Sequence, residues 1–192
     1  MANVEHSSLT GSSLHEPKGA AAANSGEVYV SNGSGSGTWQ PIHSHASVAT
    51  NFSVTSPTYA YNLDTDIAEK FVDFTPSQTH VDGFTVVTSP NLRIVYDNTE
   101  TVHGYISFVI SAGKESGVNR NVEWALFKSG TEIAGSRTIR TLGTNDEWGS
   151  MSVQAMTTLV ENDYIEIKSK ASADDTPVIY ANLQLSIIGM SA

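Results

Sequence analysis

Apolar and polar residues alternate with a period of two along most of the chain from Asn51 onward. Within residues 102–112, Ile106, Phe108 and Ile110 fall on one face of an extended chain, and the residues between them fall on the other. Turn-forming Pro, Gly, Asn and Asp separate such runs roughly every 8–15 residues, which is typical of an antiparallel sandwich or jelly roll. No segment predicts a helix convincingly, and residues 62–74 are the most ambiguous. Further strands are predicted at 84–87, 92–96, 121–128, 131–142, 148–159, 164–169 and 178–189.

The first 46 residues have a different pattern. They are mostly Ser, Gly, Ala, Asn and His, with few large aliphatic side chains and Lys18 as the only lysine. Such a stretch buries too little apolar area to offset the entropy of ordering, so we expect it to fold only on a partner. The sequence therefore predicts an all-β protein with two parts, an extended arm over residues 1–46 and an antiparallel β-sandwich over residues 47–192.

Charge and cysteine content exclude several classes of partner. The net charge is −10, and no basic stripe is present, which argues against nucleic acid and against anionic membrane surfaces. The chain has no cysteine, so disulfides and thiolate chemistry are excluded. Its start lacks the features of a secretory signal, and its apolar runs are shorter than a membrane span. We expect synthesis in a cytoplasm.

Candidate catalytic groups are limited to pairs of acidic residues. These lie at Asp64 and Asp66, at Asp146 and Glu147, and at Asp174 and Asp175. Paired acids are compatible with glycoside hydrolysis, and Asp64 with Asp66 is compatible with Ca²⁺ binding. All three pairs lie in turn-like segments, where solvated aspartates commonly stabilise turns. Nucleophile-elbow and phosphate-loop motifs are absent, so we expect no enzyme activity and no cofactor.

His43 and His45 flank Ser44 and would face the same side of an extended chain. Three parallel copies would present six imidazoles, enough for an octahedral transition ion. The alternative, which we favour, is that both are solvated linker residues.

The segment from Leu14 to Ile42 contains the words HEPKGAAAA and VYVSNGSGSGTW. These words resemble the N-terminal peptides of tailed-bacteriophage virion proteins, above all head-fibre and capsid-decoration proteins and some tail-fibre proteins. The resemblance implies a structural role on the capsid exterior, with the major capsid protein as partner. Pro17 restricts the backbone around it, and aromatic and apolar residues are typical binding anchors. The predicted capsid-binding residues are Leu14, His15, Glu16, Pro17, Lys18, Val28, Tyr29, Val30 and Trp39.

A second resemblance covers residues 100–190. The strand at 104–110, the segment VQAMTTLVENDYIEIKSKAS and the final ANLQLSIIGM are similar to the trimeric jelly roll of the tumour-necrosis-factor and complement-head type. In that fold the last strand runs along a threefold axis. The resemblance implies a homotrimer, and the residues expected at its interface are Trp124, Phe127, Leu183, Leu185 and Ile187.

Together these features predict a bacteriophage structural protein that decorates the capsid as a trimer held by its N-terminal arms. Its role would be head stabilisation or host adhesion, with a host-surface glycan as a candidate further ligand. A tail-fibre or receptor-binding tip is the main alternative. A lectin-like or cytokine-like binding module and a glycan hydrolase are the alternatives from other classes.

Overall fold

The computed structural model describes residues 23, 27–31, 37–41, 44–51, 59–66, 75–114, 117–143 and 148–191. The chain divides into two compact units, Met1–Ile42 and His43–Ala192. The predicted boundary between residues 46 and 47 lies inside a strand of the second unit, because Ser44 to Ala46 already pair with other strands of the sandwich. The boundary between the two units therefore lies a few residues earlier in the chain than the amino-acid composition predicts.

The first unit contains a β-hairpin, formed by β1 (Glu27–Ser31) and β2 (Gly37–Pro41). The hairpin pairs within the chain, at the segment where the sequence shows brief alternation. Tyr29 lies opposite Trp39, and their rings meet edge to face with centroids 5.5 Å apart. Gly37 is required at the start of β2, because a Cβ there would lie only 2.1 Å from the Val30 carbonyl oxygen and 2.9 Å from the Tyr29 ring.

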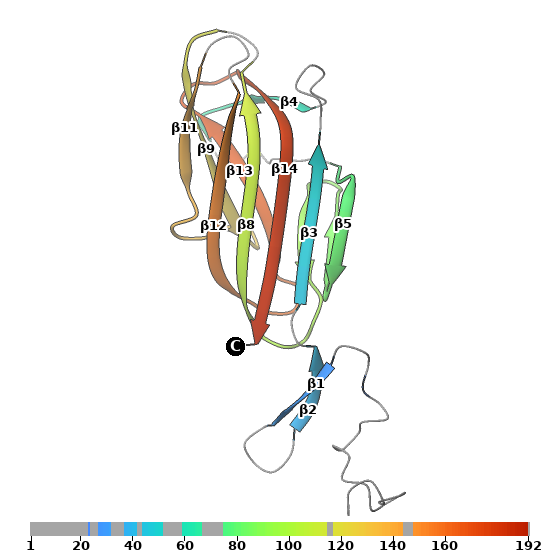
Figure 1. The fold of residues 1–192 in the computed structure, drawn as a ribbon. Helices are drawn as coiled ribbons and strands as arrows, with labels where there is room; N and C mark the ends of the chain where they lie inside the picture. Colours follow the sequence, from blue (N-terminus) through green and yellow to red (C-terminus); the bar gives the residue numbers. More distant parts are fainter. Residues whose placement is uncertain are drawn as a thin grey trace, which may run out of the picture. The chain divides into compact units, whose positions relative to one another are not determined.

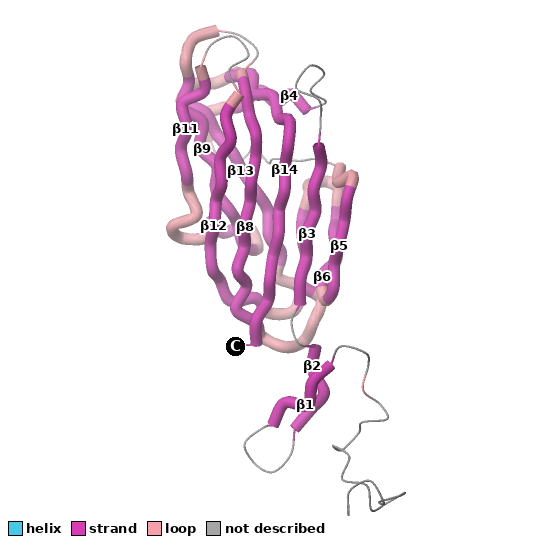
Figure 2. The backbone as a smooth tube through the Cα atoms, viewed as in Figure 1, coloured by secondary structure: helices cyan, strands magenta, loops and turns pink. Residues whose placement is uncertain are grey.

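The second unit is a sandwich of two antiparallel sheets, and Figure 1 shows the first sheet with the second behind it. Every described element of the sandwich is a strand (Figure 2). In spatial order the first sheet comprises β12 (Gly149–Leu159), β8 (Val102–Gly113), β14 (Thr176–Ser191), β3 (Ser44–Asn51) and β5 (Gln78–Asp82), with β4 (Tyr59–Leu63) paired to the start of β14.

The second sheet comprises β6 (Phe84–Val87), β7 (Arg93–Tyr96), β13 (Tyr164–Ala171) and β9 (Arg120–Lys128), with β10 (Thr131–Glu132) and β11 (Thr138–Leu142) both paired to β9. In chain order the eight main strands change sheet at every step except from β9 to β11, which is the arrangement of a jelly roll. The first sheet has the order β3-β14-β8-β12, and the second has β7-β13-β9-β11. The predicted all-β sandwich is confirmed.

Inward-facing residues of both sheets form one apolar core. Along β8, Ile106, Phe108 and Ile110, which the alternation of the sequence groups on one face, face inward. The largest of the core side chains are Trp124 on β9, Tyr96 on β7 and Tyr180 on β14. A register shift between Tyr180 and Leu183 changes the parity of β14, so both halves of this strand keep an apolar residue in the core.

The structure corrects the predicted trimer interface. Trp124, Leu183, Leu185 and Ile187 are at most 2% exposed and belong to the core of a single protomer, so they are unavailable to a second copy. Phe127 lies on the outward side of the second sheet but is only 6% exposed, and the Lys168 ammonium lies 4.6 Å from its ring centre. Alternation separates the two faces of a strand without showing which one is inside, and four of the five residues predicted at the interface lie on the inner face. The expectation for Phe127 stays a prediction.

Candidate interaction surfaces

The outward side of the first sheet is ordered in rows that cross five strands. Residues directly opposite each other in paired antiparallel strands share a face, so the registers define each row. The row that crosses β3 near its start consists of Met156, Tyr105, Ile188, His45 and Asp82, from β12 to β5.

The next row consists of Gln154, Ser107, Ser186, Ser47 and His80. Its two central hydroxyls, those of Ser47 and Ser186, lie 3.1 Å apart. The small serine side chains at the centre of this row lie beside larger side chains of the first row, so the sheet surface is uneven. The serine, glutamine and histidine side chains make the surface polar without adding ionised carboxylates or ammonium groups.

We call this side of the sheet the uncharged face. Among the described outward positions of its five strands, Asp82 is the only residue that is ionised at neutral pH. Four large apolar side chains on this face are exposed, namely Met156 at 63%, Ile188 and Met190 at 47%, and Val109 at 40%. The chain has a net charge of −10, yet this face has a single ionised group and several exposed apolar side chains. The uncharged face is therefore a candidate protein-binding surface.

A hollow of about 540 Å³ lies on the uncharged face over the paired strands β3 and β14. At its side the imidazoles of His45 and His80 stack, with ring centres 4.8 Å apart and planes 26° apart. The hollow is lined by His45, Ala46, Ser47, Ser186, Ile187 and Ile188.

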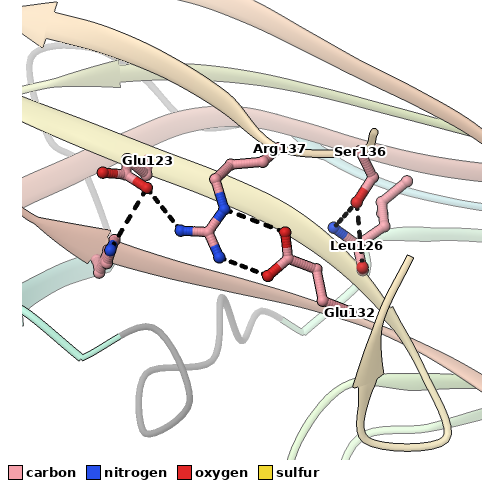
Figure 3. Close-up of polar contacts among 6 residues, drawn as sticks. Glu123, Leu126, Glu132, Ser136 and Arg137 are labelled. Carbon is pink, nitrogen blue, oxygen red and sulfur yellow. Dashed lines mark hydrogen bonds and ion pairs between the residues drawn. The ribbon is translucent and has the colours of Figure 1, made fainter. Parts of the chain in front are cut away.

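The outward side of the second sheet has the opposite character, because its charges are paired. The Arg137 guanidinium binds two carboxylates, those of Glu132 and Glu123, and the Glu123 pair measures 2.7 Å (Figure 3). Lys170 approaches the same Glu123 carboxylate at 3.6 Å. Hydrogen bonds from both glutamates raise the pKa of Arg137 above its already high ordinary value.

A second ionic group on this side is more deeply buried. Glu166 on β13 is only 1% exposed, and its carboxylate accepts a 2.6 Å hydrogen bond from Nε of Arg93 on β7. The same guanidinium lies over the ring of Tyr164, 4.4 Å from its centre. A buried carboxylate is tolerated when a cation and a hydrogen bond accompany it, which is the arrangement here.

The turn between β12 and β13 is organised by Asp163. Its carboxylate accepts hydrogen bonds from the Val160 amide at 3.0 Å and the Ser129 hydroxyl at 2.8 Å, and it pairs with Lys128 at 3.3 Å. Burial favours a higher pKa, but these three partners together outweigh burial and hold the pKa of Asp163 below its ordinary value. The predicted link from Leu159 to Tyr164 is therefore a turn with an anionic centre.

The acid pairs of the sequence have a structural explanation. The Thr65 amide and hydroxyl each donate a 2.9 Å hydrogen bond to the Asp174 carboxylate, and the Asp175 amide donates to Asp64 at 3.2 Å. Two loops about 110 residues apart in sequence thus hold one another through their aspartates. In the described part of the chain, no group of three or more His, Asp or Glu side chains is placed to hold a metal ion. Asp146 and Glu147 lie outside the described residues.

Of the predicted arm residues, four lie in the hairpin of the first unit. Val28 and Val30 are exposed on one of its faces, and Tyr29 and Trp39 pack together on the other. Leu14, His15, Glu16, Pro17 and Lys18 lie outside the described residues, as does His43. Its predicted companion His45 faces outward from β3 and stacks on His80, a residue that sequence reasoning left unassigned.

The described residues contain no helix long and apolar enough to cross a membrane. No protein-family model matches the chain, and no curated protein is significantly similar to it in sequence.

Solved structures with a similar fold have low sequence identity. An Eiger tumour-necrosis-factor protein from S. frugiperda is 12% identical over 78% of this chain and 92% of its own, with a TM-score of 0.45. The globular domain of zebrafish complement 1qA is 16% identical over 77% and 96% of the two chains, with a TM-score of 0.42. The PRD1 vertex protein P5 is 10% identical over 80% and 100%, also at 0.42. Likeness at this level carries no functional inference.

Proposed function

We propose that this chain is a structural protein of a bacteriophage virion, which decorates the capsid exterior as a homotrimer anchored by its N-terminal arms. The observation that carries the proposal is the segment 14–42, whose HEPKGAAAA and VYVSNGSGSGTW words resemble the arms of head-fibre and capsid-decoration proteins. The major capsid protein is the proposed partner, and the proposed role is binding without catalysis.

The hairpin supports a docking role for the arm. A two-stranded hairpin is marginally stable by itself in water, because it has no second layer to cover its apolar side chains. Here Val28 and Val30 are exposed on one face, and the Tyr29–Trp39 pair occupies the other. Such a hairpin gains stability when a partner surface covers one face, and aromatic side chains are effective anchors in that contact.

The uncharged face supports self-association of the sandwich. Protomers with a net charge of −10 repel one another, so a contact between copies is favoured where ionised groups are scarce and apolar side chains are exposed. The uncharged face meets both conditions. The proposed stoichiometry of three protomers rests on the resemblance of residues 100–190 to trimeric jelly rolls.

Three linked arms make attachment durable through multivalency. Once one arm has bound, the other two are held at high effective concentration near their own sites, so contacts that are weak singly give long-lived attachment. A protein displayed on a capsid needs such retention, because the particle is diluted after release.

Co-sedimentation with capsids that lack this protein tests the proposal. The full chain is compared with a chain that begins at His43, which keeps β3 whole, and with residues 1–42 fused to an unrelated monomeric protein. We expect the full chain to co-sediment at nanomolar concentration, the His43 chain to remain in the supernatant, and the fusion to bind weakly. Retention of the His43 chain on capsids would overturn the arm as anchor.

The tail-fibre or receptor-binding alternative follows from the same arm resemblance, which extends to some tail-fibre proteins. Cryo-electron microscopy of the virion separates the two roles. Knobs distributed over the head support capsid decoration, whereas density only at the tail tip overturns it in favour of the alternative.

A further inference from the structure

We propose that a pocket at one end of the sandwich binds an acidic sugar, a hexuronic acid residue of a polysaccharide, by its carboxylate and its ring hydroxyls. The pocket has a volume of about 340 Å³, and its polar lining comes from Lys114, Arg120, Asp174, Asp175 and Thr176. We call it the Lys114 pocket. All of its lining residues belong to one chain, so the inference goes beyond the proposed capsid attachment and does not depend on it.

The Lys114 pocket lies where β8 ends and β14 begins. Lys114 directly follows β8, Thr176 is the first residue of β14, and Arg120 is the first residue of β9. In Figure 1 the arrow of β8 points toward this end of the sandwich, and the arrow of β14 points away from it. Strand β3 starts at the other end, because Ser44 lies opposite Gly189 near the end of β14. A polysaccharide therefore reaches the pocket without contacting the start of β3.

Two cations meet at the pocket. Lys114 is only 2% exposed, which makes it the most deeply buried of the described lysines. Its ammonium lies over Gly117, 3.2 Å from the position that a Cβ would take there. Burial, and then the nearby charge of Arg120, lower the pKa of Lys114. A bound carboxylate would offset both effects, because it would replace lost water at the ammonium and screen one cation from the other.

Arg120 differs from Arg93, Lys128 and Arg137, each of which pairs with a carboxylate. Among the residues that the structure describes, no ion pair is found for Arg120. Its guanidinium donates one long hydrogen bond of 3.3 Å, to the carbonyl of the neighbouring Asn119. A guanidinium has five N–H donors in a planar fork that fits a carboxylate, so Arg120 is suited to binding an acidic ligand.

Aspartates contribute the acceptors of the pocket. Oδ1 of Asp174 accepts hydrogen bonds from the Thr65 amide and hydroxyl, both at 2.9 Å. The Thr176 hydroxyl donates to the Ala173 carbonyl at 2.7 Å. These bonds fix the loop before β14 in place, which reduces the entropy lost when a ligand binds. A carboxylate has about four acceptor positions, so Asp174 can also accept from a ligand hydroxyl.

Cations and carboxylates in one pocket favour a ligand with a single negative charge and several hydroxyl groups. A hexuronic acid has this composition, since its carboxylate suits Lys114 and Arg120 and its hydroxyls suit the aspartates. A phosphate group or an acidic peptide brings more negative charge, which the aspartates and the net charge of −10 repel. Small-molecule pockets have volumes of about 300–1,000 Å³, so a pocket of about 340 Å³ suits one sugar ring.

Ligand-observed NMR titration of the full chain tests the inference with methyl β-D-glucuronide. Methyl β-D-glucoside has the hydroxyls without the carboxylate, and cyclohexanecarboxylate has the carboxylate without the hydroxyls. Inorganic phosphate is the third comparison probe. We expect the glucuronide to bind with a dissociation constant on the order of 1 mM, the ordinary affinity of a ligand of this size. Each comparison probe should bind at least about tenfold more weakly.

Substitutions assign the binding to the pocket. Arg120→Gln removes the charge from a half-buried side chain and should weaken glucuronide binding about tenfold. Lys114→Met replaces the buried ammonium with an apolar side chain of similar length, and we expect a similar loss. The matched control is Lys128→Gln, which makes the same change of charge at the other end of β9 and should leave the affinity unchanged. Thermal unfolding checks that each variant is folded.

Four results would overturn the inference in distinguishable ways. Equal binding of cyclohexanecarboxylate and the glucuronide would overturn the assignment to a sugar. Tighter binding of phosphate would overturn the assignment to a carboxylate. Glucuronide binding that survives both pocket substitutions would overturn the Lys114 pocket as its site, and no binding of any probe would overturn the inference as a whole. Co-sedimentation with capsids is independent of all four, so the proposed function fails or stands separately.

Discussion

The two outer sides of the sandwich differ although their inner sides are built alike. Both sheets contribute alternating apolar residues to one core, yet the second sheet faces outward with Arg93, Glu123, Glu166 and Arg137 in ion pairs, while the first faces outward with Ser, Gln, His and exposed Met and Ile. A surface whose charges are already paired gains little from a partner. The uncharged face has apolar area to bury and few charges to desolvate, so it is the side on which association is favourable.

The largest expected effect is on assembly. Ile188→Glu places a carboxylate in the centre of the uncharged face, where it would have to be desolvated at every contact. We expect complete loss of the trimer, with the mass in light scattering falling to the 20.5 kDa of one chain. Ile139→Glu is the matched control, because Ile139 is also an exposed isoleucine but lies on the second sheet, and it should leave the trimer intact. Equal effects of the two changes would contradict the contrast between the faces.

The second expected effect is on the stability of the charged side. Arg93→Ala leaves the buried Glu166 carboxylate without its cation, which should lower the free energy of unfolding by about 3 kcal/mol. Urea denaturation monitored by tryptophan fluorescence measures this loss. Replacing both residues together, as Arg93→Leu with Glu166→Leu, should recover most of it because no buried charge remains. A double variant as unstable as the single one would argue against the pair as the cause.

The smallest expected effect concerns the turn at Asp163. Asp163→Asn removes the partner of Lys128 and should lower the free energy of unfolding by about 1 kcal/mol at pH 7. The folded-state pKa of Asp163 is depressed, so its contribution is present above the ordinary aspartate pKa and is lost as the pH falls through the folded value. The difference between wild type and variant should therefore narrow by pH 3, measured by thermal unfolding at both pH values. A constant difference would contradict the assigned cause.

The sequence alone predicts most of the strands after residue 84, because apolar and polar residues alternate clearly along them. It misses β3, β4 and β5 and predicts β10 and β11 as one strand. Along β8, alternation groups Ile106, Phe108 and Ile110 on one face, and the structure shows that this face is the inner one. Orientation of β14 is harder, because Ile187 and Ile188 are adjacent and equally apolar, and only packing decides that Ile187 is buried and Ile188 exposed. The register shift after Tyr180 adds to the difficulty, since it reverses the parity within one strand.

The candidate interaction surface could not be predicted from the sequence alone. His45 and His80 are 35 positions apart, and their stacking depends on the pairing of β3 with β5, for which the sequence has no local signal. The same holds for Asp64 and Asp174. Their carboxylates accept hydrogen bonds from the backbone amides of Asp175 and Thr65 only because two loops that are distant in sequence meet in the fold. Local patterns predict elements, whereas long-range pairings create surfaces.

The position of β3 has a mechanical consequence for a protein held by its N-terminal segment. The chain enters the sandwich at Ser44 through a strand that is hydrogen-bonded on both sides, to β14 along its length and to β5 beside it. Drag on the far end of the sandwich pulls β3 along its own axis. Because ladder hydrogen bonds run perpendicular to the strands, this force shears both ladders at once instead of opening them one bond at a time. The tether therefore joins the domain at a site that resists extraction.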